Sequence, residues 1–405
     1  MMHSASPSTS VRPPRLAALA LAAGAALATL APAGLADTIR IPKDASSLQE
    51  AVDLAQDGDT IIVTGKKAGP AVVASRNNLR IVGKGNAVLD GDGIAPALSI
   101  LGGSDITVER LAFRNGLVGG LVANNVDGLM VKRCRTQANL GHGLSMDNCP
   151  DLVVERCLLK DDGGHGLRVA GSDRARVERN VVKGSGIDGL SLSNLLADGS
   201  DDVVIRRNVV RDAGKDGIDL KGADGVVERN TIVDAFEDGL EVDGGGTGAK
   251  TRAFVFRNTV RGAGNDAIRL NGGDNRAERN LVVKPGNTGI KARGSGGHEL
   301  VRNRVVRPAG DGVEVKPLAN GCNLDKNVVT SSRKDGFSIQ SNGNLVARNL
   351  SVRADDYGVQ VAGTGNSFQN NRCRKSGDHG LSDMAGGNTY SGNSFKGVDP
   401  DGFGP

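Results

Sequence analysis

The chain has 405 residues, and its 50 Lys and Arg against 46 Asp and Glu give a formal net charge of only +4. A charge this close to balance selects no class of partner by itself. Glycine is abundant at 59 residues, whereas the chain has eight Phe, two Tyr and no Trp. This composition is typical of slender strands and tight turns and excludes a conventional aromatic-rich globular core.

The N-terminus has the pattern of a signal peptide over residues 1–36. Arg12 and Arg15 precede an apolar run from Leu16 to Leu30, and cleavage sites of the small-x-small type end at Ala33 and Ala36. A run of about 15 residues is short for a transmembrane helix. We therefore expect a secreted or periplasmic protein without a transmembrane anchor, whose mature chain keeps a net charge near +2.

Residues 37–110 are expected to form an N-terminal cap and the first coils. The segment 38–63 predicts a strand, then a short amphipathic helix that begins at Ser46 or Ser47, then a second strand. Leu48, Ala51 and Val52 share one face of that helix with Ala55. Such a helix would cover the open end of a β-sheet core, which would otherwise expose unpaired strand edges.

Residues 111–396 repeat with a period of 22 to 24 residues, and residues 397–405 are left as a C-terminal tail. An asparagine column contains Asn180, Asn208, Asn230, Asn258, Asn280, Asn303, Asn327, Asn349, Asn371 and Asn393, preceded by Cys134 and Cys157. A glycine column keeps step with it and includes Gly143, Gly166, Gly189, Gly217, Gly239, Gly289, Gly312, Gly336 and Gly358. Two wider spacings place insertions at 194–200 and 244–250. A repeat of this kind indicates a solenoid.

Apolar residues alternate within each repeat, which is the period of a strand. Ile218, Leu220, Leu240, Val242, Ile268 and Leu270 are predicted to point inward. We expect three short strands per coil, bent at the asparagine column and at the Asp-Gly turns. Asparagine suits a bend because it tolerates the left-handed conformation and its amide can bond the asparagines above and below.

This pattern resembles the right-handed parallel β-helix superfamily, which includes pectate lyases, polygalacturonases and mannuronan epimerases. The resemblance implies an all-β solenoid of about 12–14 coils. Its sharper catalytic motifs are mostly missing. "GHGLS" at 141–145 is similar to the polygalacturonase histidine motif but lacks the paired aspartates, so His142 and His165 are expected to be ordinary turn residues. An Asp-Pro-His motif is absent.

The family works on the strand that follows the Asp-Gly turn, and two residues per coil should point outward there. The first outward column runs Ser145, Arg168, Ser191, Asp219, Glu241, Arg269, Lys291, Glu314, Ser338 and Gln360. The second runs Asp147, Ala170, Ser193, Lys221, Asp243, Asn271, Arg293, Lys316, Gln340 and Ala362. The charged residues of both columns are concentrated in five successive coils, from Asp219 to Lys316. Each of the two insertions begins directly after a strand of this kind, so both would border the charged patch.

The resemblance implies a lyase-type arrangement for this patch. Asp219, Glu241 and Asp243 would hold Ca²⁺ against a substrate carboxylate. The catalytic base or neutraliser would be Arg269, Lys291 or Arg293, and substrate would be bound by Lys221, Asn271, Glu314 and Lys316. The alternative is a solvated sheet face whose opposite charges pair with one another.

Two further columns each allow a structural and a functional interpretation. The acidic turn column, Asp188, Asp216, Asp238, Asp266, Asp311 and Asp335, suits Asp-Gly turns, with calcium binding as the functional alternative. The residue before the asparagine column is basic in eleven coils: Arg110, Arg133, Arg156, Arg179, Arg207, Arg229, Arg257, Arg279, Arg302, Lys326 and Arg348. This row would either pair with the acids before it or bind a polyanion; nucleic acid is disfavoured because aromatic stacking residues are lacking.

Together these observations predict an exported β-helix that binds an acidic polysaccharide on one sheet face and modifies it by lyase or epimerase chemistry. The alternative is a non-catalytic surface or periplasmic scaffold or adhesin. Cys134 and Cys157 lie one repeat apart, which allows either a disulfide or two stacked buried thiols.

Overall fold

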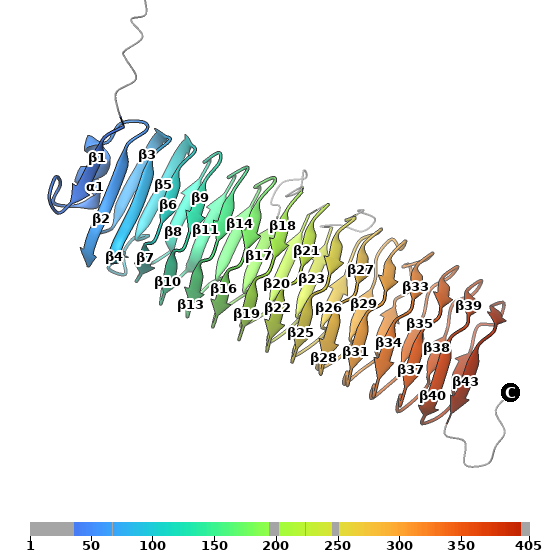
Figure 1. Ribbon diagram of the computed structural model, residues 1–405. Helices are drawn as coiled ribbons and strands as arrows, with labels where there is room; N and C mark the ends of the chain where they lie inside the picture. Colours follow the sequence, from blue (N-terminus) through green and yellow to red (C-terminus); the bar gives the residue numbers. More distant parts are fainter. Residues whose placement is uncertain (1–35, 67, 194–201, 223, 245–250, 398–405) are drawn as a thin grey trace, which may run out of the picture. The chain divides into compact units, whose positions relative to one another are not determined.

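The computed structural model describes residues 36–66, 68–193, 202–222, 224–244 and 251–397. From Ala36 on these residues build one unit, a parallel β-solenoid whose coils stack along a single axis (Figure 1). The predicted fold class is confirmed. Most of the two predicted insertions, residues 1–35 of the predicted signal peptide 1–36 and residues 398–405 of the predicted tail 397–405 lie outside the described residues.

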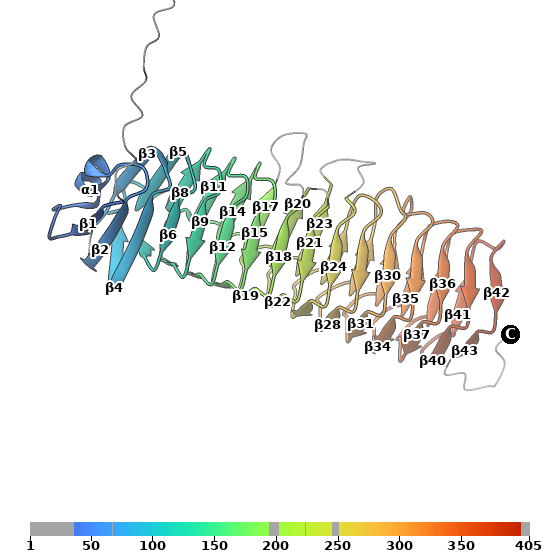
Figure 2. The ribbon, with the colours of Figure 1, turned by 45° about the horizontal axis from the view of Figure 1, so that its top comes forward.

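One helix caps the N-terminal end of the core (Figure 2). Helix α1 (Leu48–Leu54) begins after Ser47, whose side-chain oxygen accepts a hydrogen bond from the Glu50 N–H. Leu48, Ala51 and Val52 are buried, as the amphipathic pattern predicted. No helix of the described residues is long and apolar enough to cross a membrane.

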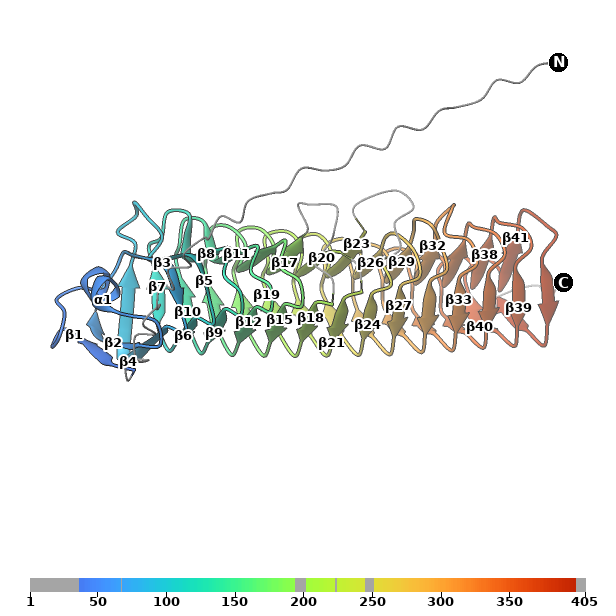
Figure 3. The ribbon, with the colours of Figure 1, turned by 90° about the horizontal axis from the view of Figure 1, so that it is seen from above.

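Each regular coil contributes three strands, which line up in three rows that run along the solenoid (Figure 3). Row 1 is a 14-stranded parallel sheet on the side of the Asp-Gly turns. Its strands are β3 (Ala71–Asn77), β5 (Leu98–Ser104), β8 (Gly119–Asn124), β11 (His142–Asp147), β14 (Leu167–Ala170), β17 (Leu190–Ser193), β20 (Ile218–Lys221), β23 (Leu240–Asp243), β26 (Ile268–Leu270), β29 (Ile290–Ala292), β32 (Val313–Val315), β35 (Phe337–Ile339), β38 (Val359–Val361) and β41 (Leu381–Asp383).

Rows 2 and 3 form a 29-stranded sheet that folds at the asparagine column. Row 2 consists of β1 (Thr38–Ile41), β2 (Thr60–Lys66), β4 (Arg80–Asp90), β6 (Thr107–Glu109), β9 (Met130–Lys132), β12 (Val153–Glu155), β15 (Arg176–Glu178), β18 (Val204–Arg206), β21 (Val226–Glu228), β24 (Phe254–Phe256), β27 (Arg276–Glu278), β30 (Glu299–Val301), β33 (Asn323–Asp325), β36 (Leu345–Ala347), β39 (Ser367–Gln369) and β42 (Thr389–Ser391). Row 3 consists of β7 (Ala112–Arg114), β10 (Arg135–Gln137), β13 (Leu158–Lys160), β16 (Val181–Lys183), β19 (Val209–Arg211), β22 (Thr231–Val233), β25 (Thr259–Arg261), β28 (Leu281–Val283), β31 (Arg304–Val306), β34 (Val328–Thr330), β37 (Leu350–Val352), β40 (Arg372–Ser376) and β43 (Ser394–Gly397).

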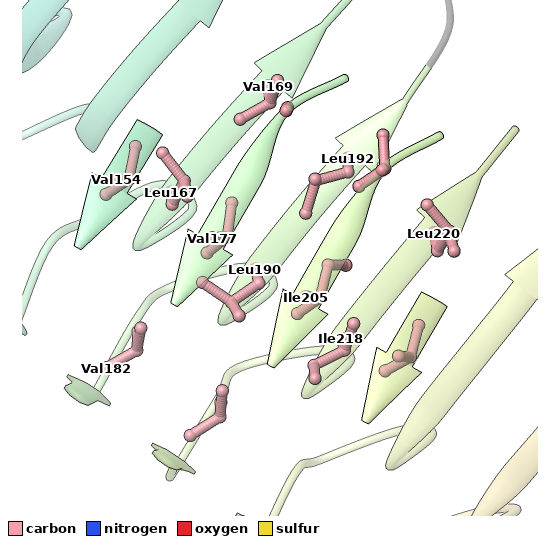
Figure 4. Packing of buried hydrophobic residues seen from close by; sticks show 14 of the residues in the cluster. Val154, Leu167, Val169, Val177, Val182, Leu190, Leu192, Ile205, Ile218 and Leu220 are labelled. Atoms are coloured by element: carbon pink, nitrogen blue, oxygen red, sulfur yellow. The ribbon is translucent and has the colours of Figure 1, made fainter. Parts of the chain in front are cut away.

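The middle residue of each short strand in rows 2 and 3, and the alternate residues of row 1, fill an aliphatic core between the rows. The six residues predicted to point inward, Ile218, Leu220, Leu240, Val242, Ile268 and Leu270, are all fully buried. Figure 4 shows neighbouring members of this core, such as Val177, Leu190 and Ile205, stacked from coil to coil. The alternation of apolar and polar residues therefore fixes which side chains remain outside.

The asparagine column is a continuous buried ladder, as predicted. From Asn180 to Asn371 each amide Nδ2 donates to Oδ1 of the asparagine one coil further on, at 3.0–3.1 Å, and Asn393 ends the ladder. Each Nδ2 also donates to a backbone carbonyl oxygen of row 2, for example Asn230 to Ile205. The bend is thus tied together in ten successive coils.

The prediction that these asparagines adopt the left-handed conformation is wrong. The left-handed residue is the one just before the ladder position. It is basic in the eleven coils from Arg110 to Arg348, with φ between 52° and 58°, and it is Asn370 or Gly392 in the last two. The physical reason is that the asparagine side chain must point inward to join the ladder, so the chain reverses one residue earlier, where the side chain points out. We call these eleven exposed cations the basic ridge.

All five cysteines are buried and unpaired. Cys134 and Cys157 lie in successive coils as two stacked thiols and not as a disulfide, which is one of the two predicted alternatives. Burial, together with the neighbouring Cys157, raises the pKa of the Cys134 thiol well above its usual value. These thiols are structural, because a buried neutral thiol is a poor nucleophile.

Candidate functional site

The charged patch of row 1 is arranged as the sequence predicted. In the parallel register Asp219 lies beside Glu241, Glu241 beside Arg269, Arg269 beside Lys291 and Lys291 beside Glu314. In the second column Lys221 lies beside Asp243. Because neighbouring strands are about 4.8 Å apart, these side chains form a continuous ladder on β20, β23, β26, β29 and β32. We call this surface the charged face.

A second set of carboxylates, from the turns that precede these strands, lies at the edge of the charged face. One oxygen of each turn aspartate accepts a backbone N–H from the next coil: Asp216 Oδ1 from Asp238 at 2.8 Å, and Asp238 Oδ1 from Asp266 at 2.9 Å. The same bond joins Asp311 to Asp335 at 3.0 Å. These bonds support the structural interpretation of the acidic column, and they leave the second carboxylate oxygen of each residue for other contacts.

Arg269 joins three of these carboxylates. Its Nη2 lies 2.8 Å from Asp238 Oδ2 and 3.5 Å from Asp266 Oδ2, and its Nη1 lies 3.4 Å from Glu241 Oε1. Burial works to lower the pKa of Arg269, but the three carboxylates outweigh it and raise that pKa above its usual value. A base must give up its proton before it can accept one. This contact therefore suits Arg269 to a neutralising role and disfavours the predicted role as base.

The lysines of the charged face also contact carboxylates. Lys291 Nζ lies 2.7 Å from Asp266 Oδ2 and 3.5 Å from Glu314 Oε2. Lys316 Nζ lies 2.6 Å from Glu314 Oε1. At the other end, Lys221 Nζ lies 2.8 Å from Asp219 Oδ2. Ion pairs between acidic and basic side chains thus occur along the whole ladder, although two acids and then two bases are neighbours in its first column.

The charged face is layered by depth. The side chains of Asp219 and Glu314 are only 3% and 7% exposed, whereas those of Lys221 and Lys316 are 41% and 39% exposed. Arg293, which follows β29, is exposed as well. The carboxylates therefore lie at the base of the face, and several of the cations reach the solvent above them.

Two of the buried carboxyl groups are poised to carry a proton near neutral pH. Burial raises the pKa of Asp238 to about 7, and the neighbouring Asp266 and Asp216 act in the same direction. Arg269 opposes this shift, but its charge is shared among three carboxylates, so burial is decisive. Burial likewise raises the pKa of Asp219 to about 6. Groups with pKa values near the working pH are effective general acids and bases.

The structure does not bring the three predicted calcium ligands together. Within the described residues, the group of acids close enough to share a cation is Asp216, Asp238 and Glu241, whose ligand atoms lie within 4.8 Å of one another. Only Glu241 belongs to both sets. Asp219 instead pairs with Lys221, and Asp243 lies beside Lys221 in the register.

Three orphaned oxygens lie in the same region. Asp216 Oδ2, Asp219 Oδ1 and Asn271 Oδ1 are buried and accept no hydrogen bond. Asp216 Oδ2 has only an ion pair, with Lys215 Nζ at 3.2 Å. The amide of Asn271, a predicted substrate ligand, donates its Nδ2 to Glu241 Oε1 at 2.9 Å. Asp219 Oδ1 and Asn271 Oδ1 are therefore acceptors available to a donor from a ligand.

Sequence reasoning missed that the turn aspartates belong to the charged face. Asp216, Asp238 and Asp266 were interpreted mainly as turn residues, yet their outer oxygens meet Lys215, Arg269 and Lys291. A signal was present in the spacing, since a charged outward residue follows each of them by three positions. An aspartate in the turn and an outward residue three positions later, on the strand, lie on the same side of the chain, so their side chains can meet.

His142 and His165 both occupy the turn column, as predicted, but His142 is already the first residue of β11, and only His165 lies in the turn before its strand. His142 Nδ1 accepts the His165 N–H at 3.0 Å, and His165 Nδ1 lies 3.3 Å from the Asp188 N–H. The two rings stack with centroids 5.0 Å apart. Burial lowers the pKa of His142 to about 4, so this ring stays neutral at physiological pH.

Comparison with known proteins identifies the fold. A family model described as a right-handed beta helix region matches residues 72–195 and 246–395. The receptor binding domain of the Siphovirus 9NA tailspike is 11% identical, with a TM-score of 0.52 over 91% of this chain and 77% of that one. No curated protein sequence matches the chain.

Two further solved structures align with lower TM-scores. The A-module of the Azotobacter vinelandii mannuronan C-5 epimerase AlgE6 is 13% identical, with a TM-score of 0.42 over 87% of this chain and 94% of that one. The catalytic unit of a Streptomyces thermodiastaticus α-1,3-glucanase is 15% identical, with a TM-score of 0.44 over 92% of this chain and 71% of that one.

Proposed function

The chain belongs to the right-handed β-helix family, and from this premise we propose that it binds an acidic polysaccharide along the charged face. The observation that carries the proposal is the layering of that face, with carboxylates at its base and the cations Lys221, Arg293 and Lys316 toward solvent. Arg293 and Lys316 lie in neighbouring coils and Lys221 lies three coils away, so together they complement a linear chain with several anionic groups better than a small ligand.

We extend the proposal to modification of the bound polymer by lyase or epimerase chemistry. Both reactions begin when a base removes the proton next to the uronate carboxylate. Asp238 and Asp219, with pKa values raised to about 7 and about 6, are the groups of the charged face best suited to move that proton. Arg269 and Lys291 would neutralise charge that develops on the substrate carboxylate. Arg293 remains the predicted basic residue that reaches furthest into solvent.

If calcium binds at the charged face, it must compete with basic side chains of the protein for the same carboxylates. Asp216, Asp238 and Glu241 offer only oxygen ligands, which suit Ca²⁺, and bound Ca²⁺ would help to neutralise a substrate carboxylate. Arg269 already contacts Asp238 and Glu241, and Lys215 contacts Asp216, so each of the three carboxylates has a cation of the protein beside it. We therefore expect the wild-type protein to bind calcium weakly.

The test uses the chain from Asp37 onward, which corresponds to the proposed exported form. Binding of polygalacturonate and of a neutral dextran would be measured by calorimetry for the wild type and for Lys221→Gln/Lys316→Gln. The control Lys43→Gln/Lys84→Gln removes the same charge from exposed lysines near the N-terminal cap. We expect the control to bind polygalacturonate like the wild type and the first variant to bind at least about fivefold more weakly, because it lacks two cations that face the polyanion. Equal binding by both variants would refute the proposal.

Turnover is measured separately. New double bonds absorb in the ultraviolet if the protein is a lyase, and the uronate composition changes in NMR spectra if it is an epimerase. Loss of either activity in Asp238→Asn, with polysaccharide binding kept, would support the proton-transfer role of Asp238.

The alternative is a non-catalytic scaffold or adhesin, and one observation favours it. Four cations of the charged face each contact a carboxylate within the protein: Arg269, Lys291, Lys221 and Lys316. Their charges are therefore already paired without a ligand. A scaffold predicts that polygalacturonate binding and turnover are both absent from the wild-type protein.

A further inference from the structure

The described strands of row 3, β7 to β43, contain no acidic residue, although Asp90 at the end of β4 lies beside Arg114 of β7 and pairs with it. The outward positions of β7 to β43 hold aliphatic, neutral polar and basic side chains only. Leu158 and Val181 are among the exposed aliphatic residues. The basic residues of these strands are Arg114, Arg135, Lys160, Lys183, Arg211, Arg261, Arg304, Arg372, Arg374, Lys375 and Lys396.

The basic ridge borders this row along the bend between rows 2 and 3. Its cations follow one another at the strand spacing of about 4.8 Å, so that they form a straight line parallel to the solenoid axis. The ridge and the strands of row 3 together form a long strip, with an aliphatic floor and cations along it.

Ion pairs within the protein do not neutralise all the positive charge of the basic ridge. Eight of its members share four acids: Glu109, Glu155, Glu278 and Asp325 each contact two ridge cations. Arg257 lies over the ring of Phe256, with its guanidinium carbon 4.7 Å from the centroid. Arg207 and Arg229 make no side-chain hydrogen bond or ion pair with any described residue. The ridge therefore carries excess positive charge.

The backbone conformation at the ridge strengthens this point. A left-handed conformation is unfavourable for a residue with a Cβ atom and is best tolerated by Gly and Asn. The chain nevertheless places Arg or Lys at this position in eleven successive coils. The geometry of the repeat alone would favour Asn or Gly at this left-handed position. We infer that the cations are present for a role other than forming the bend.

A hollow lies where the ridge and row 3 begin. Its volume is about 560 Å³, and the charged residues that line it are Arg110, Arg114, Arg133, Arg135 and Lys160. None of the residues that line it is acidic. Leu158 and the backbone around Ala112 and Phe113 contribute apolar surface. The hollow thus has five cations and an apolar wall at one end of the strip. Four of the cations also contact acids outside the hollow: Arg110 and Arg133 share Glu109, Arg114 contacts Asp90, and Lys160 contacts Asp161.

We propose that the basic ridge, row 3 and this hollow form a second binding surface, for a linear acidic glycan that runs along the solenoid axis. The charge is arranged in lines rather than over a broad plane, which fits a chain better than a membrane. The exposed apolar side chains of row 3, such as Leu158 and Val181, are also short aliphatic ones on strands of the sheet, whereas membrane-binding surfaces insert protruding aromatic and long apolar groups. This surface is separate from the charged face of row 1 and does not depend on its function.

The ridge is tested with Arg207→Asn/Arg229→Asn, and the hollow with Arg135→Gln/Lys160→Gln. Asparagine accepts the left-handed conformation, so the first pair removes charge without disturbing the bend. Lys43→Gln/Lys84→Gln is the charge-matched control. Binding of polygalacturonate would be measured between low and moderate salt in the Lys221→Gln/Lys316→Gln background, which removes exposed cations of the charged face.

We expect the control to retain binding and each test pair to lower the slope of log affinity against log salt by about 1 to 2, because each pair removes two cations that displace counterions from the glycan. Melting temperatures should not fall. If neither test pair binds more weakly than the control, the proposal is wrong. If vesicles of phosphatidylglycerol and phosphatidylcholine bind through these residues and polygalacturonate does not, the surface is a membrane site and the proposal is likewise overturned. If the Lys221→Gln/Lys316→Gln background itself no longer binds polygalacturonate, the second surface does not bind this glycan and the proposal is wrong.

Discussion

Replacing Asn230 by Ala should destabilise the solenoid far more than the loss of one polar side chain would suggest. Its Nδ2 donates to the Ile205 carbonyl oxygen at 2.9 Å and to Asn258 Oδ1 at 3.0 Å. Its Oδ1 accepts the backbone N–H of Asn208 at 2.9 Å and the Nδ2 of Asn208 at 3.0 Å. Asn208 and Asn230 are 0% and 1% exposed, so water does not replace these bonds.

The magnitude follows from the groups left without a partner. Asn208 Nδ2 still donates to the Val177 carbonyl oxygen, and Asn258 Oδ1 still accepts the Asn230 N–H. The Asn208 N–H loses its acceptor altogether. An unsatisfied buried donor costs about 1–3 kcal/mol, and the remaining bonds add a smaller amount. We therefore expect a loss of about 2–4 kcal/mol in the free energy of unfolding.

The assay is urea unfolding followed by circular dichroism, with Asn393→Ala as the control. Asn393 ends the ladder and is half-buried, so water can replace its bonds and the expected loss is smaller. The reasoning would be refuted by an unchanged unfolding midpoint in both Asn230→Ala and Asn258→Ala, because the ladder would then contribute nothing to stability.

Three other predictions concern the charged face. Because the pKa of Asp238 is raised to about 7, its contribution to stability is full below pH 4 and is lost as the pH rises through 7. The wild type should therefore lose about 2–4 kcal/mol of unfolding free energy between pH 4 and pH 8 through this group, and Asp238→Asn should not show that loss. An unchanged pH profile of unfolding in Asp238→Asn would contradict this prediction. Arg269→Gln leaves three carboxylates without their shared cation, so it should lower the free energy of unfolding by about 3–5 kcal/mol at pH 8 and by less at pH 5. In a double-mutant cycle, Glu241→Gln should relieve part of that loss. Additive losses would show that the two residues do not interact. Calcium should raise the melting temperature of Arg269→Gln more than that of the wild type, and equal shifts would show that Arg269 does not compete with calcium.

Much of the fold could be predicted from the sequence because the repeat fixes the register. Once Leu240 and Val242 point inward, Glu241 and Asp243 must point outward, and column alignment then places Glu241 beside Arg269. The same logic predicted the asparagine ladder. A strand period of two residues leaves no freedom at these positions.

The geometry of the turns could not be predicted in the same way. Column alignment shows that Asp238 recurs with the repeat, but not that one of its oxygens accepts the Asp266 N–H while the other meets Arg269. That division depends on the side-chain rotamer and on the path of the turn. The left-handed conformation was assigned to asparagine on propensity, and the demand of the buried ladder for an inward amide overrode it.

The central claim is that an acidic polysaccharide binds along the charged face of row 1, and a crystal structure of the chain from Asp37 onward with a bound oligogalacturonate tests it most directly. The account predicts that the sugar lies across β20, β23, β26, β29 and β32, with its carboxylates next to Lys221, Arg293 or Lys316. A complex in which the charged face is bare, with the sugar bound elsewhere on the solenoid, would contradict it.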